Sequence, residues 1–450
     1  MYGNGVKSVI RREPVSDVVH IPPKSDFRAV KDQFHTEHLP ENKFKVVSPL
    51  KESPFSVPFN QLAWYGAWSL EIKGEVKRQI FKIYQFYMLS LSIFLMGLFV
   101  SDFYQSFGDI KKMSWNICVS TLFYGAVSKA YLLYRKKDHI NTLRQKLHED
   151  GESRNAPEDL PLHQNTLKYL KTIKKHITAI AICFGSVWII SRYLTKYSET
   201  KLLPIPLAIP LDIDLDDSLT FDVVFVILSV VGSTGIYFII QQEYGMFSIL
   251  LQLMREWNAL VNDIPKLDNF SNDSAVVERQ VQKTRAKALL RQFCARQQIL
   301  IRYTEIYEDC YNTSMLLQVL VITVLAVSIA FQCFVLTMDY LPELSYQIGY
   351  LTIVIYDMFL LCYIATQLKS TCRSLGQVLY DRNWYRMDSE IRKDIVLMIL
   401  MSQRPPRVTV TKAVDLNLHA FNVVHNEKHI QLAGAVSTNH DENLKATQFS

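Results

Sequence analysis

The sequence predicts an all-α protein, a polytopic membrane helix bundle with its N-terminus in the cytoplasm. Three observations lead to this prediction. Segments almost free of charge alternate with segments crowded with Lys and Arg along the 450 residues. The uncharged segments reach about 20 residues, the length that a helix needs to cross a bilayer. The basic residues also alternate between the two sides of the predicted spans, as a fixed membrane orientation requires.

Six segments are long and apolar enough to span the membrane. In order they are about Ile80–Val100, Met113–Tyr134, Ile177–Thr195, Leu219–Ile240, Ser314–Met338 and Ser345–Gln367. The third is the least apolar, and we expect Arg192 near its outer end to extend its charged group toward the lipid headgroups. The fourth continues into the amphipathic run Phe247–Leu260, which predicts one long helix that leaves the bilayer.

The basic residues set the orientation. The first 79 residues carry twelve Lys and Arg, and the loops after spans two and four carry ten and nine. The loops after spans one, three and five carry two, two and none, while the tail after Gln367 carries eleven. Because Lys-rich and Arg-rich loops stay in the cytoplasm, the N-terminus is predicted to be cytoplasmic. A G-protein-coupled receptor has the opposite topology and is the less favoured class.

The spans divide the chain into six regions. These are a cytoplasmic N-terminal region (1–79), spans one to four (80–246), a cytoplasmic helical anchor region (247–313), spans five and six (314–367), a further anchor segment with the start of a seventh helix (368–421), and a polar, divergent tail (422–450). Val276–Ile306 is predicted to run into span five as one helix and to pair antiparallel with the extension of span four. Asp263–Ser274 reads as the connecting loop.

Nothing in the sequence predicts an enzyme, a cofactor or a metal site. The seven cysteines form no CxxC pair, and no phosphate-binding loop or HExxH motif occurs. His35 with His38 and His425 with His429 have ligand-like spacing, but they lie in polar tails, so ordinary surface histidines are the favoured interpretation. We expect membrane lipid and a small molecule as partners, and no nucleic acid.

Aromatic residues gather toward the predicted outer ends of several spans and are the candidate ligand-binding residues. They are Trp115, Phe123, Trp188, Tyr193, Phe221, Phe225, Tyr346 and Tyr350. As a set they are expected to line an apolar pocket that opens outward, the usual form of a small-molecule site. Interface belts of Trp and Tyr produce the same pattern, and for any single residue a belt or packing role is favoured.

Asp357, in the middle of the sixth span, is the polar candidate for the same site. A carboxylate at that depth costs about 2.5–3.5 kcal/mol on insertion scales, so it must face protein or water. Two interpretations stand side by side. Asp357 either contacts a ligand or a conduction path, or it is a protonated or hydrogen-bonded packing residue.

The stretch after span six carries a recognisable pattern. Ser374-Leu375 and Val378-Leu379-Tyr380 precede Asn383-Trp384-Tyr385, and Ser402-Gln403-Arg404-Pro405 follows after the apolar run Ile395–Met401. Together with the predicted topology, this pattern resembles the insect odorant receptor family. The resemblance extends over about Phe59 to Phe421.

The resemblance implies a mechanism. Members of the family are tetrameric ligand-gated cation channels of the plasma membrane of olfactory sensory neurons, in which a tuning subunit assembles with a shared co-receptor. Volatile odorants bind within the outer halves of spans two, three, four and six. Subunits join through a cytoplasmic anchor, for which Tyr380, Trp384 and Tyr385 are the candidates. The co-receptor has a longer loop between spans four and five, so a tuning subunit is the closer match.

The tail departs from the family, in which a seventh span lines the pore. Leu416–Phe421 begins like that helix, but the longest apolar run within Asn422–Ser450 is Leu432–Val436, which is far too short to cross a bilayer. We therefore expect six clear spans, an incomplete seventh and both termini inside. The departure indicates a different splice, a retained intron or a gene-model artefact. It also raises the alternative of a non-conducting or truncated assembly partner of the co-receptor.

Overall fold

A computed structural model describes residues 57–68, 74–153, 159–194, 197, 203–205, 217–270, 276–335, 341–410, 412 and 414–416. The chain divides into two units, Met1–Pro49 and Leu50–Ser450, and every described residue belongs to the second. The paired histidines of the two tails and residues 417–450, with the predicted seventh helix beyond Leu416, lie outside the described residues.

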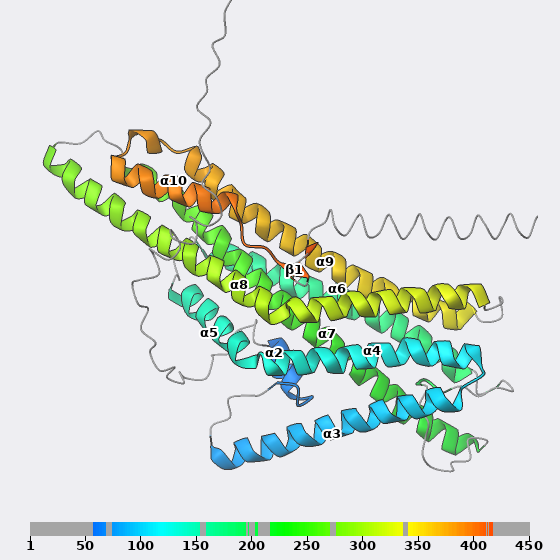
Figure 1. Ribbon diagram of the computed structural model, residues 1–450. Helices are drawn as coiled ribbons and strands as arrows, with labels where there is room; N and C mark the ends of the chain where they lie inside the picture. The colour runs from blue at the N-terminus through cyan, green and yellow to red at the C-terminus, as the bar shows by residue number, and fades with distance from the viewer. Residues whose placement is uncertain are drawn as a thin grey trace, which may run out of the picture. The chain divides into compact units, whose positions relative to one another are not determined.

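The described part of the chain is a helical bundle with one small hairpin (Figure 1). Its elements are α2 (Val57–Ala63), α3 (Glu75–Gln105), α4 (Ile110–Arg135), α5 (Lys137–Ser153), α6 (Leu160–Leu194), α7 (Ser218–Asp263), η2 (Ile264–Phe270), α8 (Val276–Val335), α9 (Leu341–Tyr380), η4 (Trp384–Arg386), α10 (Ser389–Gln403), β1 (Thr409–Val410) and β2 (Val414–Asp415). The all-helical prediction is confirmed, and the antiparallel β1–β2 pair adds to it.

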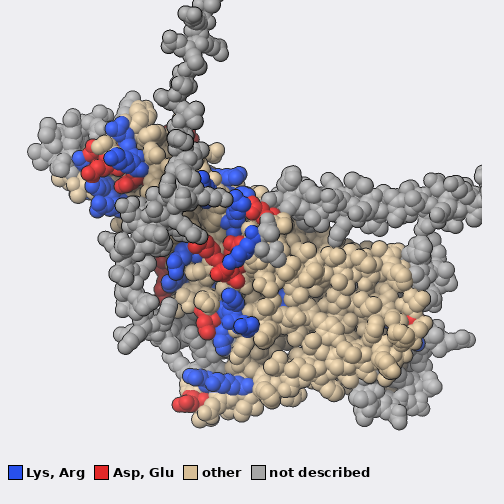
Figure 2. Space-filling model, in the orientation of Figure 1, with Lys and Arg blue, Asp and Glu red and all other residues tan. Residues whose placement is uncertain are grey.

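Six of the described helices are long and apolar enough to cross a membrane, and each overlaps one predicted span. They occupy Glu75–Gln105, Lys112–Arg135, Leu160–Leu194, Ser218–Asp268, Val281–Cys333 and Ile348–Tyr380. Figure 2 shows uncharged residues over one end of the bundle and Lys, Arg, Asp and Glu gathered toward the other. Only 6% of the apolar window of α3 is buried, so most of the surface of this helix has no contact with the rest of the described chain.

The charged end of the bundle is built by helices that continue beyond their apolar segments. α7 has 46 residues and α8 has 60, and at about 1.5 Å per residue both far exceed the thickness of a bilayer. As the sequence predicts, α7 continues past span four, and α8 enters span five without a break. The extension of α7 is buried on nearly every side, with Phe247, Trp257 and Leu260 at its centre. α8, α9 and α10 pack around this end of the bundle.

Two segments differ from the prediction. The connecting loop expected over Asp263–Ser274 begins with the 3-10 helix η2, because Ile264 and Leu267 are fully buried in the core and hold the chain in a tight turn. After α10 the chain forms the hairpin, which turns at Lys412 with φ 59°. The Leu416 backbone N–H donates to the Val408 carbonyl at 2.9 Å and extends the pairing of the hairpin, and the rest of the helix predicted over Leu416–Phe421 lies outside the described residues.

Candidate functional site

The predicted aromatic residues of α4 and α6 lie in one apolar cluster. Trp188 is 3% exposed and is buried together with Phe99 of α3 and Ile205, while Trp115 and Phe123 pack against this group. The Phe99 and Phe123 rings have centroids 5.4 Å apart. These contacts fill the ends of α3, α4 and α6 that the topology predicts to be outer, so the three aromatic residues act as packing in this state.

The predicted aromatic residues of α6 and α7 form a neighbouring chain of rings. Tyr193 packs edge-on against Phe225 at a centroid distance of 5.4 Å, and Phe225 contacts Phe221 at 5.8 Å. Arg192 is 5% exposed, and its guanidinium lies 4.5 Å from the centre of the Trp115 ring. The expectation that Arg192 extends toward the headgroups is therefore wrong, because stacking on the indole holds its charge inside the bundle.

A small apolar cavity lies between α6, α7 and α9. Its volume is about 30 Å³, and its lining consists of Ala181, Phe184, Gly185, Ile236, Ile239, Ile240, Tyr350 and Ile353. Tyr350 is the one predicted ligand residue among them. Tyr346 lies one turn earlier on α9, but its side chain is outside the described part of the structure. Among the predicted residues with described side chains, the structure thus brings Tyr350 to a cavity and the others to packed clusters.

Two glycines shape this cavity. A Cβ atom on Gly185 would have no atom within 4 Å, so the α6 backbone borders open space there. A Cβ atom on Gly349 of α9 would collide with the Phe184 ring, so this ring lies directly on the α9 backbone. Ligand pockets for drug-sized molecules usually measure about 300–1,000 Å³. An odorant therefore requires the lining side chains to move, and Phe184 is the largest apolar side chain among them.

We expect Gly349→Ala to disturb this arrangement. The new methyl group occupies the position of the Phe184 ring and drives it away from α9, into the cavity. Overpacking of this kind costs about 1–3 kcal/mol of stability. Thermal unfolding of the detergent-purified chain should show a lower midpoint. Gly235→Ala is the matched control, since a Cβ atom there meets nothing within 4 Å. Equal midpoints for both variants would contradict the observed Phe184–Gly349 packing.

Asp357 lies in a buried polar cluster rather than on the cavity wall. The Lys129 ammonium of α4 contacts the Glu243 carboxylate of α7 and the Gln318 side chain of α8, and the Gln318 amide donates to Asp357 at 3.5 Å. All four residues are at most 9% exposed. We call these four residues the polar cluster. This environment supports the interpretation of Asp357 as a packing residue, and it joins four helices inside the membrane region.

The three anchor candidates lie together at the end of α9. The Trp384 indole N–H donates to the Tyr380 carbonyl at 3.2 Å, and the two rings are 6.3 Å apart. Tyr380 is 66% exposed and Tyr385 55% exposed. Exposed aromatic side chains at the charged end of the bundle are the residue type that protein interfaces favour. A role in subunit contact stays a prediction.

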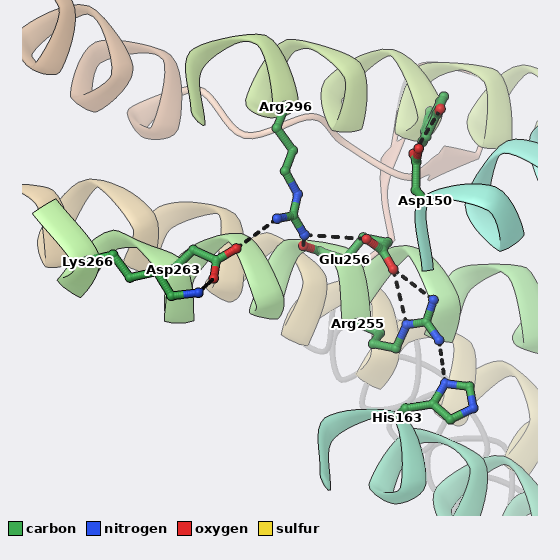
Figure 3. A network of polar contacts seen from close by, with 8 residues as sticks. Asp150, His163, Arg255, Glu256, Asp263, Lys266 and Arg296 are labelled. Atoms are coloured by element: carbon green, nitrogen blue, oxygen red, sulfur yellow. Dashed lines mark hydrogen bonds and ion pairs between the residues drawn. The ribbon is translucent and has the colours of Figure 1, made fainter. Parts of the chain in front are cut away.

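A second polar network holds the charged end of the bundle together (Figure 3). Glu256 of α7 is 2% exposed and accepts hydrogen bonds from Arg255 at 2.8 Å and from Arg296 of α8 at 3.5 Å. Arg255 also contacts the His163 ring of α6 at 2.6 Å, and Arg296 donates to Asp263 at 2.9 Å. The network therefore fixes α6, α7 and α8 to one another beyond the membrane region.

Several residues of the cavity and of the polar cluster were not predicted from the sequence. Phe184 and Ile239 resemble any lipid-facing residue of a span, and Lys129 lies within span two, five residues before its predicted end. A detectable signal was present for the polar cluster. Lys129, Glu243, Gln318 and Asp357 each interrupt or border an apolar segment, and polar groups inside a membrane need partners.

A model of the odorant receptor family matches residues 109–426. The chain is 21% identical to Odorant receptor 67a of Drosophila melanogaster over 43% of this chain and 44% of that protein, and 24% identical to Odorant receptor 13a over 34% and 39%. The matches thus span less than half of these relatives. The solved structure of olfactory receptor OR5 from Machilis hrabei in complex with eugenol has a TM-score of 0.70 at 16% identity. It covers 85% of this chain and 97% of that chain.

The family match covers well over half of the chain, and the solved receptor has the same helical fold. Six candidate spans agree with a multi-pass membrane protein. The family consists of ion channels rather than enzymes. The chain belongs to the odorant receptor family.

Proposed function

We propose that this chain is a tuning subunit that binds a small apolar volatile and gates a cation channel together with a shared co-receptor. It acts in the plasma membrane of olfactory sensory neurons, with its N-terminus in the cytoplasm and its anchor region contacting the other subunits of a heterotetramer. The ligand enters the cavity between α6, α7 and α9. Burial of apolar surface supplies the affinity, since charge is absent from the lining.

The position of the cavity is the observation that supports this proposal most. It lies between three membrane helices, and its wall is aliphatic and aromatic with one hydroxyl, that of Tyr350. A larger groove of about 400 Å³ lies between α3, α4 and α8, but its rim residues Tyr131 and Leu320 are 58% and 52% exposed. That groove opens sideways to lipid and does not enclose a ligand.

Binding opens the channel only if the ligand contacts the open state more tightly than the closed one. Six of the other predicted ligand residues form the two packed clusters at the outer ends of the spans: Trp115, Phe123, Trp188, Tyr193, Phe221 and Phe225. Tyr346 precedes Tyr350 by about one turn on α9, and Asp357 lies in the polar cluster. Rearrangement of the outer clusters enlarges the cavity in this scheme.

Co-expression with an insect odorant co-receptor tests the proposal. Cells that contain both chains should pass an inward cation current on exposure to an apolar volatile, and a panel should include eugenol, the ligand of the solved relative. Each chain expressed alone provides the control. A tag at the N-terminus should label only after permeabilisation. Labelling of this tag in intact cells would contradict the orientation and would favour a G-protein-coupled receptor.

The same experiment separates the alternative function. Association with the co-receptor, without current beyond that of the co-receptor alone, would identify a non-conducting assembly partner. The sequence feature that favours this alternative is the polar stretch Asn422–Ser450, which contains no apolar run of membrane-spanning length.

A further inference from the structure

Three lysines share one face of α6 where the helix leaves its apolar segment. Lys168, Lys171 and Lys175 are exposed and follow a spacing of three and four residues, which places them on one side of a helix. We call them the α6 lysine face. Lys174, on a neighbouring side, instead packs over the Tyr244 ring at 4.9 Å. The opposite side of α6 is buried through Leu170, Ile173 and Ile177.

The ammonium groups of this face have no carboxylate partner within the described part of the chain. Several other basic residues of the same end of the bundle are paired with carboxylates of the protein. Lys287 contacts Glu390, Lys369 lies 2.9 Å from Asp415, and Arg296 lies 2.9 Å from Asp263. The Thr172 hydroxyl, which lies between the lysines, donates to the Lys168 carbonyl of its own helix. Three positive charges are thus left for an external anion.

The face is also hollowed. A depression of about 400 Å³ is lined by Gln164, Leu167, Lys168, Lys171, Thr172 and Lys175. The surface of this depression is mainly apolar, although three of its six lining residues are lysines. Such a surface matches a molecule that has a charged phosphate beside less polar glycerol and acyl carbons.

The position of the α6 lysine face relative to the apolar segment of α6 indicates which class of ligand it binds. Lys175 lies two residues before the uncharged segment that begins at Ile177, and Lys171 is one helical turn, about 6 Å, further from that segment. The headgroup layer on each side of a bilayer is about 5–8 Å thick. Lys175 and, through its long side chain, Lys171 therefore reach the level of the lipid phosphates, while Lys168, about 10 Å beyond Lys175, lies on the aqueous side of that layer. On the proposed orientation this is the cytoplasmic leaflet, which contains the anionic lipids.

We propose that the α6 lysine face binds the phosphate headgroup of an anionic phospholipid of the cytoplasmic leaflet. Lys171 and Lys175 contact the phosphate, and Lys168 contacts the distal part of the headgroup. The site is separate from the cavity between α6, α7 and α9, and it holds α6 at a fixed depth in the membrane.

Native mass spectrometry of the full chain in a neutral detergent tests this site. The probe is dioctanoyl phosphatidylserine, with dioctanoyl phosphatidylcholine and inorganic phosphate in parallel titrations. The wild-type chain should bind the anionic lipid at least tenfold more tightly than the zwitterionic one. Each lysine near an anionic surface contributes about a fivefold change in affinity, so Lys168→Gln/Lys171→Gln/Lys175→Gln should remove most of this preference.

The matched control removes the same charge elsewhere. Lys146, Arg291 and Lys393 are exposed residues of α5, α8 and α10, and their triple replacement by Gln should leave the lipid preference unchanged. Lys168→Arg/Lys171→Arg/Lys175→Arg should also retain it. Equal loss in the test and control triples would show general electrostatic attraction and overturn the proposal. Displacement of the lipid by inorganic phosphate at equal concentration would overturn it as well, since the site would then recognise free phosphate.

Discussion

Glu256→Ala should destabilise the charged end of the bundle by about 3–5 kcal/mol, the cost of removing one partner from a buried ion network. The Glu256 carboxylate lies between Arg255 and Arg296 and is 2% exposed. Without it, two guanidinium groups remain beside each other without a shared anion. Size-exclusion chromatography after stepwise heating should show a markedly lower temperature of aggregation for the detergent-purified variant.

Two further variants define the cause of this loss. Glu390→Ala removes a carboxylate that contacts Lys287 at the surface and should leave the aggregation temperature unchanged, because solvent screens exposed pairs. Arg296→Met combined with Glu256→Ala should be less harmful than the sum of the single changes, because the double variant removes an unmatched charge. An aggregation temperature of Glu256→Ala equal to that of the wild type would contradict the network in Figure 3.

Lys129→Met should have a comparable effect inside the membrane region. The Lys129 ammonium contacts Glu243 and Gln318, and Asp357 lies in the same cluster. Its removal leaves two buried carboxyl groups without this cation, which costs about 3–5 kcal/mol when one partner of a buried pair is lost. The measurement is the same heating experiment, together with the amount of chain at the cell surface.

The rescue variant for this cluster is Lys129→Met/Glu243→Gln. It leaves no unmatched charge between α4 and α7, so its aggregation temperature should lie above that of Lys129→Met alone. Lys146→Met, on the exposed face of α5, provides the control for loss of a lysine. A double variant that is less stable than both Lys129→Met and Glu243→Gln would show that the Lys129–Glu243 contact does not stabilise the packing of α4 against α7.

Hydropathy and charge were sufficient to predict the spans and the helices that continue from them. The run Phe247–Leu260 repeats apolar residues at helical spacing, and this pattern predicts its place in α7 directly. The hairpin between Thr409 and Asp415 was not predicted, because strands of two residues are too short to show an alternation of apolar and polar side chains. It depends on Lys412 adopting a left-handed conformation, which tertiary packing imposes.

The candidate site was predictable only in part, and the reason is the membrane itself. In lipid an apolar side chain is equally acceptable on the outside of a helix and on a cavity wall, so Phe184, Ile236 and Ile239 carry no distinguishing signal. Aromatic size pointed to Trp188 and Phe225, which fill space between helices instead. Tyr350 was predicted as one of the aromatic residues toward the outer ends of the spans, and it is the member of that set that lines the cavity.

Of the polar cluster, the sequence indicated one member and did not indicate its partners. A single carboxylate in a span, Asp357, was recognisable as a residue in need of a partner. Its partners lie on three other helices, and the sequence separations of 39 residues to Gln318 and of more than a hundred to Lys129 and Glu243 cannot be matched without the packing of the bundle. Lys129, which lies near the inner end of predicted span two, is the cation of the cluster.

The concentration–response curve of the odorant-evoked current with Gly185→Leu tests whether an odorant acts inside the cavity between α6, α7 and α9. The new side chain enters open space at the cavity wall, while Gly235→Leu makes the same change on α7 away from the cavity lining. We predict at least a tenfold higher half-maximal concentration for Gly185→Leu, about 1.4 kcal/mol, and a wild-type curve for Gly235→Leu. A wild-type curve for Gly185→Leu would contradict the account.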